Sequence, residues 1–278
     1  MRKTDSGGQC GAMCKVSPSG IACFLLVLIS APRYSALRAQ EDLPAGKQWK
    51  LVWSDEFNGT SLDETKWTRA GPYRVFDGWI VKDAVYVDGK GHLVIKTFRK
   101  DGRYCGGMVS TKGKFEHKYG YWVARCKMPT QVGHFPAFWI WSSALQPAAP
   151  EAKTGGLECG TEIDIIEYLA RTPDIVYHTL HYLIDGKRKS RGEKVRVPGI
   201  STGFHTIAVE WTPREYIFYV DGKVTWRTTE AVSHREEFAC LSDRVGKWAG
   251  DIREAELPDF FIVDYVRIYD VPEKPVSP

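Results

Sequence analysis

Three acidic residues occupy the segment EIDIIE, which begins at Glu162 and is the part of the chain best suited to chemistry. Side chains of a regular β-strand alternate between two faces, so Glu162 and Asp164 share one face and Glu167 would lie on the other. A β-bulge inserts one extra residue into a strand and shifts this alternation by one. We therefore predict a bulge at Ile165 or Ile166, which places all three carboxylates on one face.

Carboxylates that share one face of a strand disfavour each other's ionisation, and this drives their pKa values apart. One ionised and one protonated carboxyl group are what hydrolysis of a glycosidic bond requires. The alternative is an edge strand whose solvent face happens to be acidic. Three acids in register, with no basic residue among them, favour a functional site.

Aromatic residues gather just before the acidic segment, in the run HFPAFWIW that begins at His134. Aromatic rings offer large contact areas to the apolar faces of sugars at a small cost in conformational entropy. Trp139 and Trp141 are two residues apart and would project from the same strand face. Phe138 and Ile140 have the opposite parity, and we expect them in the core together with at most one of the two tryptophans.

Two histidines, His178 and His181, follow on a predicted strand over residues 176–183. Their spacing of three places them on opposite faces, so we expect at most one of them to reach the acidic site. The sequence has no HExxH pair, no GxSxG elbow and no phosphate-binding glycine loop, which argues against a metallohydrolase, a serine hydrolase and a nucleotide-binding enzyme.

Strand signals dominate the chain that must position these residues. The runs 93–97, 121–127 and 205–211 are rich in β-formers, and the Asp-Gly pairs at 88–89 and 221–222 predict hairpin turns. No apolar run has the 3.6-residue period of a helix. The sequence predicts an all-β sandwich with a jelly-roll course.

Two segments show loop composition. Residues 142–160 are rich in Ala, Pro and Gly, and residues 185–199 carry a cluster of basic side chains: Lys187, Arg188, Lys189, Arg191, Lys194 and Arg196. We expect the second segment to be a solvated surface loop. Contact with an anionic polysaccharide is the functional alternative.

The N-terminal residues are typical of an export signal. Arg2, Lys3 and Lys15 precede the apolar run 21–31, and small residues lead to a cleavage zone near Ala39. We predict a secretory signal peptide over residues 1–39 and a secreted or periplasmic protein that is not membrane-bound once mature. A signal anchor is the alternative, although the run is short for a membrane span.

The remaining chain is electrically balanced. Residues 1–39 hold five basic residues and one acidic residue, which leaves 33 of each sign in residues 40–278. This balance argues against a nucleic-acid partner.

Four cysteines remain after the predicted signal: Cys105, Cys126, Cys159 and Cys240. An exported protein with an even number of cysteines could form one or two disulfides, and sequence does not select the pairing. Free buried thiols are the alternative. No two of them have the CxxC spacing of a metal site.

Together these features resemble glycoside hydrolase family 16, the laminarinase-like β-glucanases, from Leu51 to Tyr269. The motifs that carry the resemblance are WSDEFNG at residues 53–59, YGYWVAR at 119–125, PAFW at 136–139, EIDIIE at 162–167 and VDYVRIY at 263–269. The resemblance implies a concanavalin-like jelly-roll sandwich of two curved antiparallel sheets. We expect one catalytic domain over residues 40–270, and composition indicates a Pro-rich tail at 271–278.

The resemblance assigns roles by position. Glu162 would be the nucleophile, Glu167 the general acid/base and Asp164 the assisting carboxylate. Trp139, Trp248 and His181 would contact substrate, and Trp141 joins them through its place on the strand. No cofactor is expected for catalysis. A structural calcium ion, held by Glu56, Gly91 and Asp264 through oxygen ligands, is implied by analogy.

Some residues depart from the laminarinase pattern, namely Val123, Phe135 and the stretch 238–248.

We expect a monomer that cleaves β-1,3- or mixed β-1,3/1,4-glucan with retention, through a covalent glycosyl-enzyme. A galactan such as agarose, porphyran or carrageenan is the alternative substrate, motivated by the basic segment. Transglycosylation, and glycan binding without catalysis as in a lectin, are the competing functions.

Overall fold

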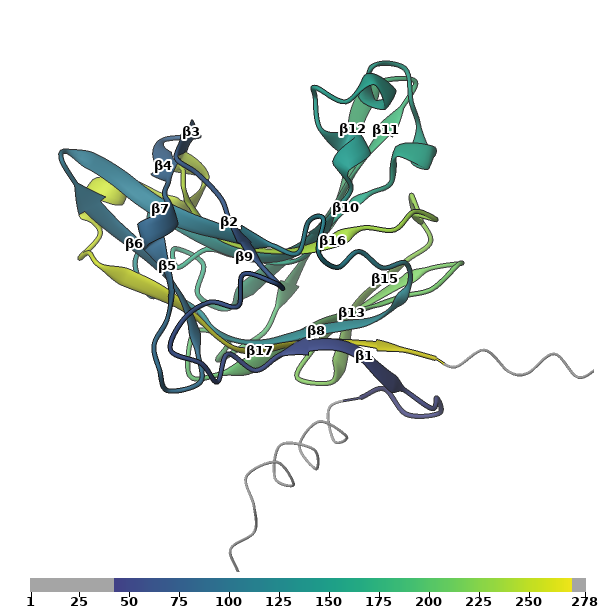
Figure 1. The fold of residues 1–278 in the computed structure, drawn as a ribbon, viewed down its shortest axis with the longest axis horizontal. Coiled ribbons are helices and arrows are strands. Elements are labelled where there is room, and N and C mark those ends of the chain that lie inside the picture. The colour runs from purple at the N-terminus through teal and green to yellow at the C-terminus, as the bar shows by residue number, and fades with distance from the viewer. Residues whose placement is uncertain (1–42, 272–278) are drawn as a thin grey trace, which may run out of the picture. The chain divides into compact units, whose positions relative to one another are not determined.

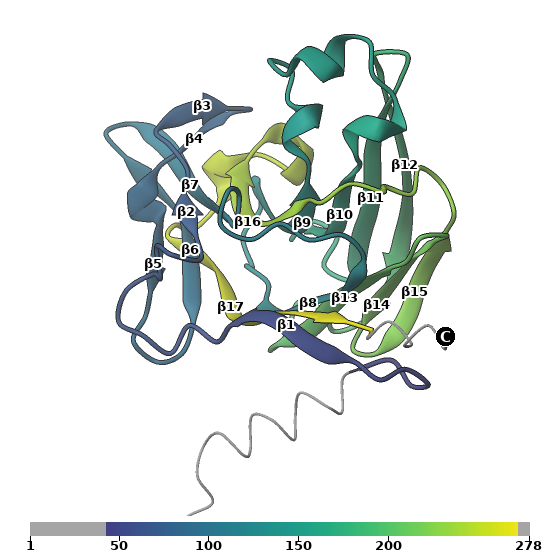
Figure 2. The same ribbon diagram turned by 45° about the vertical axis from the view of Figure 1, so that its right-hand side comes forward.

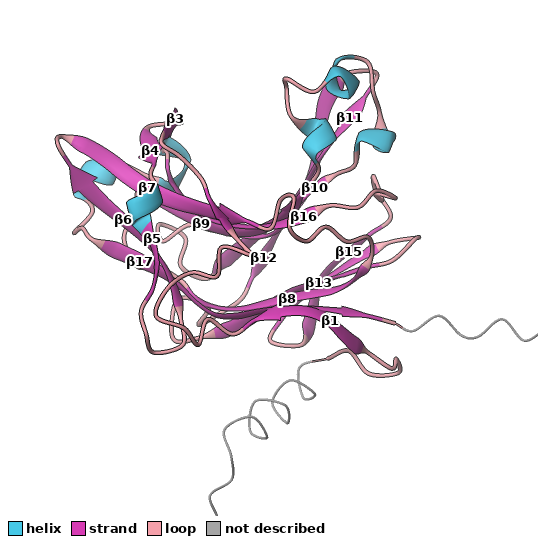
Figure 3. Cartoon of the chain, in the orientation of Figure 1, coloured by secondary structure: helices cyan, strands magenta, loops and turns pink. Residues whose placement is uncertain are grey.

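The structure of the chain is a computed structural model that describes residues 43–271. Within this range the regular structure consists of β-strands and six short 3₁₀ turns, with no α-helix (Figure 3). The prediction of an all-β protein is confirmed. Among these residues, no helix is both long and apolar enough to cross a membrane.

One sheet, which we call the site sheet, carries the acidic segment. Its strands run antiparallel in the order β2–β7–β16–β9–β10–β11–β12. Their bounds are β2 (Thr68–Arg69), β7 (Arg103–Ser110), β16 (Phe238–Val245), β9 (His134–Trp141), β10 (Glu162–Tyr168), β11 (Ile175–Ile184) and β12 (Lys187–Arg196). The acidic strand β10 therefore lies in the interior of this sheet, between β9 and β11.

The second sheet, the outer sheet, packs beneath it as a separate layer (Figures 1 and 2). Its order is β5–β6–β17–β8–β13–β14–β15, with β1 also paired to β17. Its bounds are β1 (Lys50–Asp55), β5 (Val85–Val87), β6 (Leu93–Lys100), β8 (Gly120–Lys127), β13 (His205–Trp211), β14 (Tyr216–Val220), β15 (Lys223–Thr228) and β17 (Asp259–Asp270). The short strands β3 (Tyr73–Val75) and β4 (Gly78–Ile80) form a hairpin against β7, and β4 pairs with β7 in parallel.

The core lies between the two sheets. Ile163, Ile165 and Ile166 of β10 are each at most 1% exposed and belong to the main apolar cluster, together with Phe138 and Ile140 of β9. The predicted burial of Phe138 and Ile140 is confirmed. Because strand side chains alternate, the remaining residues of β9 and β10 are left for the opposite face of the site sheet.

Most of the predicted local structure is present. The Asp-Gly pair at 221–222 joins β14 to β15, and the pair at 88–89 lies in the connection between β5 and β6. Residues 142–160 form a connection with three 3₁₀ turns, at Ser143–Leu145, Pro150–Lys153 and Leu157–Cys159.

The interpretation of residues 185–199 as a loop is wrong. Most of this segment is strand β12, which pairs with β11 along its full length. As an edge strand with almost every side chain exposed, it has no apolar alternation by which to recognise it. A signal was nevertheless present, because Asp185 (φ 51°) and Gly186 (φ 68°) form a left-handed hairpin turn that is typical of Asp-Gly pairs.

The four cysteines of the described chain are all buried and unbonded, so the free-thiol alternative describes them. The predicted signal over residues 1–39 and residues 272–278 of the predicted tail lie outside the described residues.

Candidate active site

A β-bulge interrupts β10 where parity requires it. Against β11, Asp164 pairs with Thr179 but Glu167 pairs with Tyr177, so three steps along β10 match two along β11. The same shift separates Asp164 from Ile166 in the pairing with β9. The predicted bulge is confirmed. It turns both Ile165 and Ile166 into the core and returns Glu167 to the face of the other two acids.

His178 holds the bulge from the core side. A bulge leaves a backbone group without a ladder partner, and here the Ile165 carbonyl accepts a hydrogen bond of 2.6 Å from His178 Nδ1. His178 Nε2 lies 2.9 Å from the Thr225 hydroxyl of the outer sheet. Burial lowers the pKa of His178 to about 4. The imidazole is therefore neutral, with a donor for Ile165 and an acceptor for Thr225.

The entry to β10 is fixed by a second buried group. The Thr161 backbone N–H donates 2.8 Å to the Glu237 carboxyl, and burial raises the pKa of Glu237 to about 8. Gly160 adopts φ 90°, and a Cβ at this position would lie 2.3 Å from Glu237 Oε1. Only glycine allows the chain to pass this carboxyl and deliver Glu162 to the start of the strand.

The three acids open into one cleft of about 560 Å³ on the face of the site sheet that points away from the core. Its lining consists of acids, bases and aromatic rings: Phe76, Asp77, Phe135, Ala137, Trp139, Glu162, Asp164, Glu167, His181, Arg188, Arg244, Gly246, Lys247 and Trp248. The cleft draws on β9, β10, β11, β12 and β16, so segments far apart in sequence meet there.

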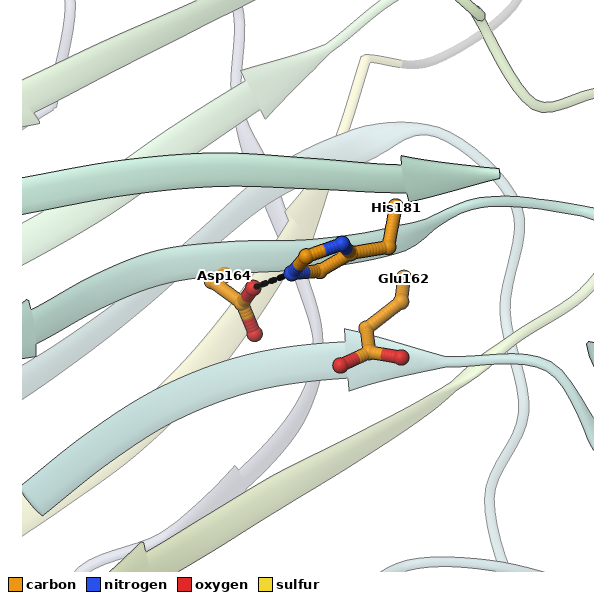
Figure 4. Close-up of side chains that lie close together, drawn as sticks. All are labelled: Glu162, Asp164 and His181. Atoms are coloured by element: carbon orange, nitrogen blue, oxygen red, sulfur yellow. Dashed lines mark ion pairs between the residues drawn. The ribbon is translucent and has the colours of Figure 1, made fainter. Parts of the chain in front are cut away.

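Glu162, Asp164 and His181 converge at one end of β10 (Figure 4). Each contributes a polar atom, and these atoms lie within 4.8 Å of one another. His181 Nε2 lies 3.5 Å from Asp164 Oδ2, and Arg188 of β12 donates 2.7 Å to Glu162 Oε2. His178 and His181 do lie on opposite faces, as predicted.

Burial and crowding shift two of the acids toward the protonated form. Burial, followed by the charges of Glu167 and Glu162, raises the pKa of Asp164 well above its usual value. Burial raises the pKa of Glu167 to about 7, although the Arg244 charge opposes the shift. Burial also lowers the pKa of His181. Both pKa shifts favour the neutral forms of His181 and Asp164, although the distance between the two groups would also suit an ion pair.

Trp139 and Trp248 supply aromatic surface to the cleft. Trp139 is almost fully buried, and its Nε1–H donates 3.2 Å to Ser242 Oγ, which fixes the ring plane. Trp248 is 39% exposed and packs edge-on against Phe135 and Tyr177. Trp141 shares the face of Trp139 but is not among the cleft-lining residues.

Two basic residues that line the cleft were not among the site residues predicted from the sequence. Arg244 of β16 lies with its guanidinium carbon 4.7 Å from the centre of the Trp139 ring, and Lys247 follows just beyond the strand. Both lie in the stretch 238–248, which departs from the laminarinase pattern. That departure was the available signal, but strand pairing alone shows that it faces the acids.

The residues of the predicted calcium site do not form a free donor set. Glu56 accepts two hydrogen bonds from Arg267, at 2.8 and 2.7 Å, and Asp264 accepts one from Arg125. A calcium ion bound by these carboxylates would have to displace both guanidinium groups, whereas binding through the backbone oxygens of Glu56 and Gly91 would not. The calcium site stays a prediction, and no step of the chemistry depends on it.

Comparison with known proteins identifies relatives over most of the chain. A family model described as glycosyl hydrolases family 16 matches residues 75–265. A beta-glucanase of Rhodothermus marinus is 30% identical, over 89% of this chain and 93% of its own length. A keratan-sulfate endo-1,4-beta-galactosidase of Sphingobacterium multivorum is 28% identical, over 82% of this chain and 57% of its own length.

Solved structures share the fold. An endo-beta-1,3-glucanase from Pyrococcus furiosus superposes with a TM-score of 0.68 at 26% identity, covering 83% of this chain and 97% of the other. The laminarinase from Rhodothermus marinus superposes with a TM-score of 0.67 at 27% identity, covering 82% and 99%. The jelly-roll architecture of two curved antiparallel sheets is therefore the architecture of this chain.

Proposed function

The chain belongs to glycosyl hydrolases family 16, and from this premise we propose that it is a retaining endo-glycanase with Glu162 as nucleophile and Glu167 as general acid/base. The observation that carries the proposal is the bulged strand β10, which presents three carboxyl groups to one cleft. The raised pKa of Glu167 suits a proton donor at neutral pH. The ion pair with Arg188 presents Glu162 as a carboxylate.

In the first step the Glu162 carboxylate attacks the anomeric carbon while Glu167 transfers its proton to the glycosidic oxygen. The bond between the anomeric carbon and the glycosidic oxygen breaks, and the leaving chain departs as an alcohol. A glycosyl ester of Glu162 forms. In the second step Glu167, now ionised, takes a proton from water. The resulting hydroxide adds to the anomeric carbon and releases Glu162.

Asp164 has the position to assist this exchange. It lies on the same face as Glu162, within 4.8 Å, and its pKa is raised. A protonated Asp164 can donate a hydrogen bond to the charged Glu162 carboxylate and relax as the ester forms. His181 beside it is neutral and orients Asp164 from the next strand.

Beta-glucan is the substrate that the relatives favour. The beta-glucanase of Rhodothermus marinus and the endo-beta-1,3-glucanase of Pyrococcus furiosus carry glucan in their names. On the basis of these names we propose that the substrate is a β-1,3- or mixed β-1,3/1,4-glucan. We also propose that residues 1–39 act as a signal that directs export of the protein. A charged galactan is the second candidate, because Arg188, Arg244 and Lys247 line the cleft.

A polysaccharide panel with product analysis tests the proposal. The panel contains laminarin, lichenan, agarose, κ-carrageenan and keratan sulfate, and proton NMR follows the anomeric signal of the first products. We expect β-anomers to appear first, since a double displacement retains configuration. First products in the α-configuration would contradict Glu162 as nucleophile, and steady lengthening of chains would show transglycosylation.

A further inference from the structure

We propose that the cleft contains an oxyanion-binding subsite built on Arg244, and that the preferred substrate is a β-glycan whose sugars carry sulfate or carboxylate groups. The inference rests on the proposed glycanase function and, of its two substrate candidates, favours the charged glycan over neutral β-glucan. It starts from a feature that catalysis leaves unexplained, a half-buried guanidinium without a carboxylate partner.

Arg244 lies on an aromatic platform. Its guanidinium carbon is 4.7 Å from the centre of the Trp139 ring, and Trp139 itself is held by Ser242. Within residues 43–271, the guanidinium makes a single side-chain hydrogen bond, a weak contact of 3.8 Å from Nη2 to Met108 Sδ. An arginine side chain carries five N–H donors in a plane, so most of its donors remain available to a ligand in the cleft.

Comparable arginines of the protein do have acidic partners. Arg188 pairs with Glu162, Arg267 with Glu56 and Arg125 with Asp264. Among residues 43–271, no carboxylate lies within ion-pair distance (4.0 Å) of the Arg244 nitrogens, although three acids line the same cleft. Arg244 therefore influences those acids only through the electrostatic effect of its charge. Its N–H groups do not hydrogen-bond to them.

The neighbouring strand adds positive charge along the cleft. β12 carries six basic residues and one acid. Arg188 and Lys194 pair with Leu183 and Tyr177 of β11, so they share the face of His181, and Lys194 Nζ lies 5.6 Å above the Tyr177 ring. The one acid, Glu193, pairs with His178 and belongs to the opposite face. The other basic residues divide between the two faces, with Arg196 on the face of His181 and Lys187, Lys189 and Arg191 on the face of Glu193. Of the bases on the His181 face, Arg188 lines the cleft itself.

This arrangement matches an anionic sugar better than a neutral one. A guanidinium binds sulfate or carboxylate through two parallel charge-assisted hydrogen bonds, whereas hydroxyl groups offer weaker single contacts. Trp139, itself almost fully buried, supports the guanidinium from below. The charged substituent would therefore lie beside Arg244, in the cleft that the three acids line.

Binding measurements with matched polysaccharide pairs test the subsite. The pairs are keratan sulfate with its desulfated form, and a β-1,3-glucan oxidised to the uronate at C6 with its parent glucan. Affinity is measured by calorimetry for Glu162→Gln and for Glu162→Gln/Arg244→Gln. We expect the preference of the first protein for the charged member of one pair to fall about 10- to 100-fold in the second.

The matched control is Glu162→Gln/Arg103→Gln. Arg103 also lies 4.7 Å above an indole ring, that of Trp79, but it does not line the cleft. This variant should keep the preference for the charged chain. A preference within the keratan sulfate pair identifies sulfate as the recognised group, and a preference within the oxidised glucan pair identifies carboxylate.

Two results would overturn the proposal. In the first, the protein binds neutral chains as tightly as charged ones, so that no oxyanion site exists whether or not the chain hydrolyses glucan. In the second, Arg244→Gln alone shifts the pH profile of hydrolysis equally on all substrates and leaves the charged-to-neutral ratio unchanged, so that Arg244 serves only the acids. Selective loss of charged substrates supports the subsite. Because binding is measured without turnover, failure of the hydrolase assignment would be seen separately.

Discussion

The two faces of strand β10 contain residues of opposite kinds and serve opposite purposes. The cleft face carries Glu162, Asp164 and Glu167, whereas the core face carries isoleucines that are almost fully buried. The core face has three isoleucines because the bulge turns two consecutive residues inward. Packing on one face therefore determines where the acids lie on the other.

The two histidines of β11 repeat this contrast. His178 is fully buried, bonds the carbonyl of the bulge and has no contact with substrate space. His181 lies beside Asp164 and lines the cleft. Two histidines three positions apart therefore have different roles. The one on the core face supports the fold, and the one on the cleft face contacts a proposed catalytic acid.

The strongest test of this contrast removes charge from the cleft face alone. Glu162→Gln should lower kcat by about 10⁴-fold or more, because no other group can form the glycosyl ester. The free energy of unfolding should change by less than about 1 kcal/mol, because the Arg188 side chain is 58% exposed and water can solvate it once the ion pair is lost. Reducing-sugar release and urea unfolding measure the two effects.

A full rate in Glu162→Gln would contradict the assignment of the nucleophile. A large loss of stability would show that the cleft face also supports the fold. Glu64→Gln is a suitable control, because Glu64 pairs with Arg69 on the surface, away from the cleft-lining residues.

The next largest effect concerns the proton donor. Glu167 must be protonated to act as an acid, so kcat/KM should fall as pH rises through about 7, the pKa of this group. Glu167→Gln should lower the rate about 10²- to 10⁴-fold and remove this basic limb. Measuring kcat/KM from pH 4 to 9 in both proteins shows the difference.

The same carboxyl group predicts a direction for stability. Because its folded pKa lies above the unfolded value, the folded state binds the proton more tightly, and stability falls as pH rises from about 4.5 to 7. Glu167→Gln should abolish this part of the decline. If kcat/KM of Glu167→Gln still falls as pH rises through about 7, the proton donor is another group.

The smallest effect tests the core face. His178→Leu leaves the Ile165 carbonyl without its partner and should cost about 1–3 kcal/mol of unfolding free energy. A shifted bulge would also misplace Glu167 and reduce kcat by roughly tenfold. Thr225→Val, which removes only the second hydrogen bond of His178, is the matched control and should show weaker changes in both measurements.

Much of the site could be read from residue order because strand alternation is a local property. Six consecutive residues, beginning at Glu162, were enough to predict the bulge and the shared face of the acids. The spacing of His178 and His181 was enough to predict their opposite placement. The strand β12 was missed for a related reason. An edge strand exposed on both faces has no apolar alternation, and its Asp-Gly turn was the one local indication.

Arg244 shows what residue order could not provide. It follows β10 at a long distance along the chain, and it reaches the acids only because β16 pairs with β9, next to β10. No local pattern distinguishes an arginine that stacks on Trp139 from one that faces solvent. The same holds for the pKa of Glu167, which depends on burial and on charges from other strands.

The sequence by itself determined the kind of chemistry, since the acids, their spacing and the extra isoleucine are properties of one short segment. The tertiary structure decided which carboxyls are protonated and which cations face the substrate. These depend on desolvation and on electrostatic contacts between distant strands, and such terms exist only once the two sheets have packed.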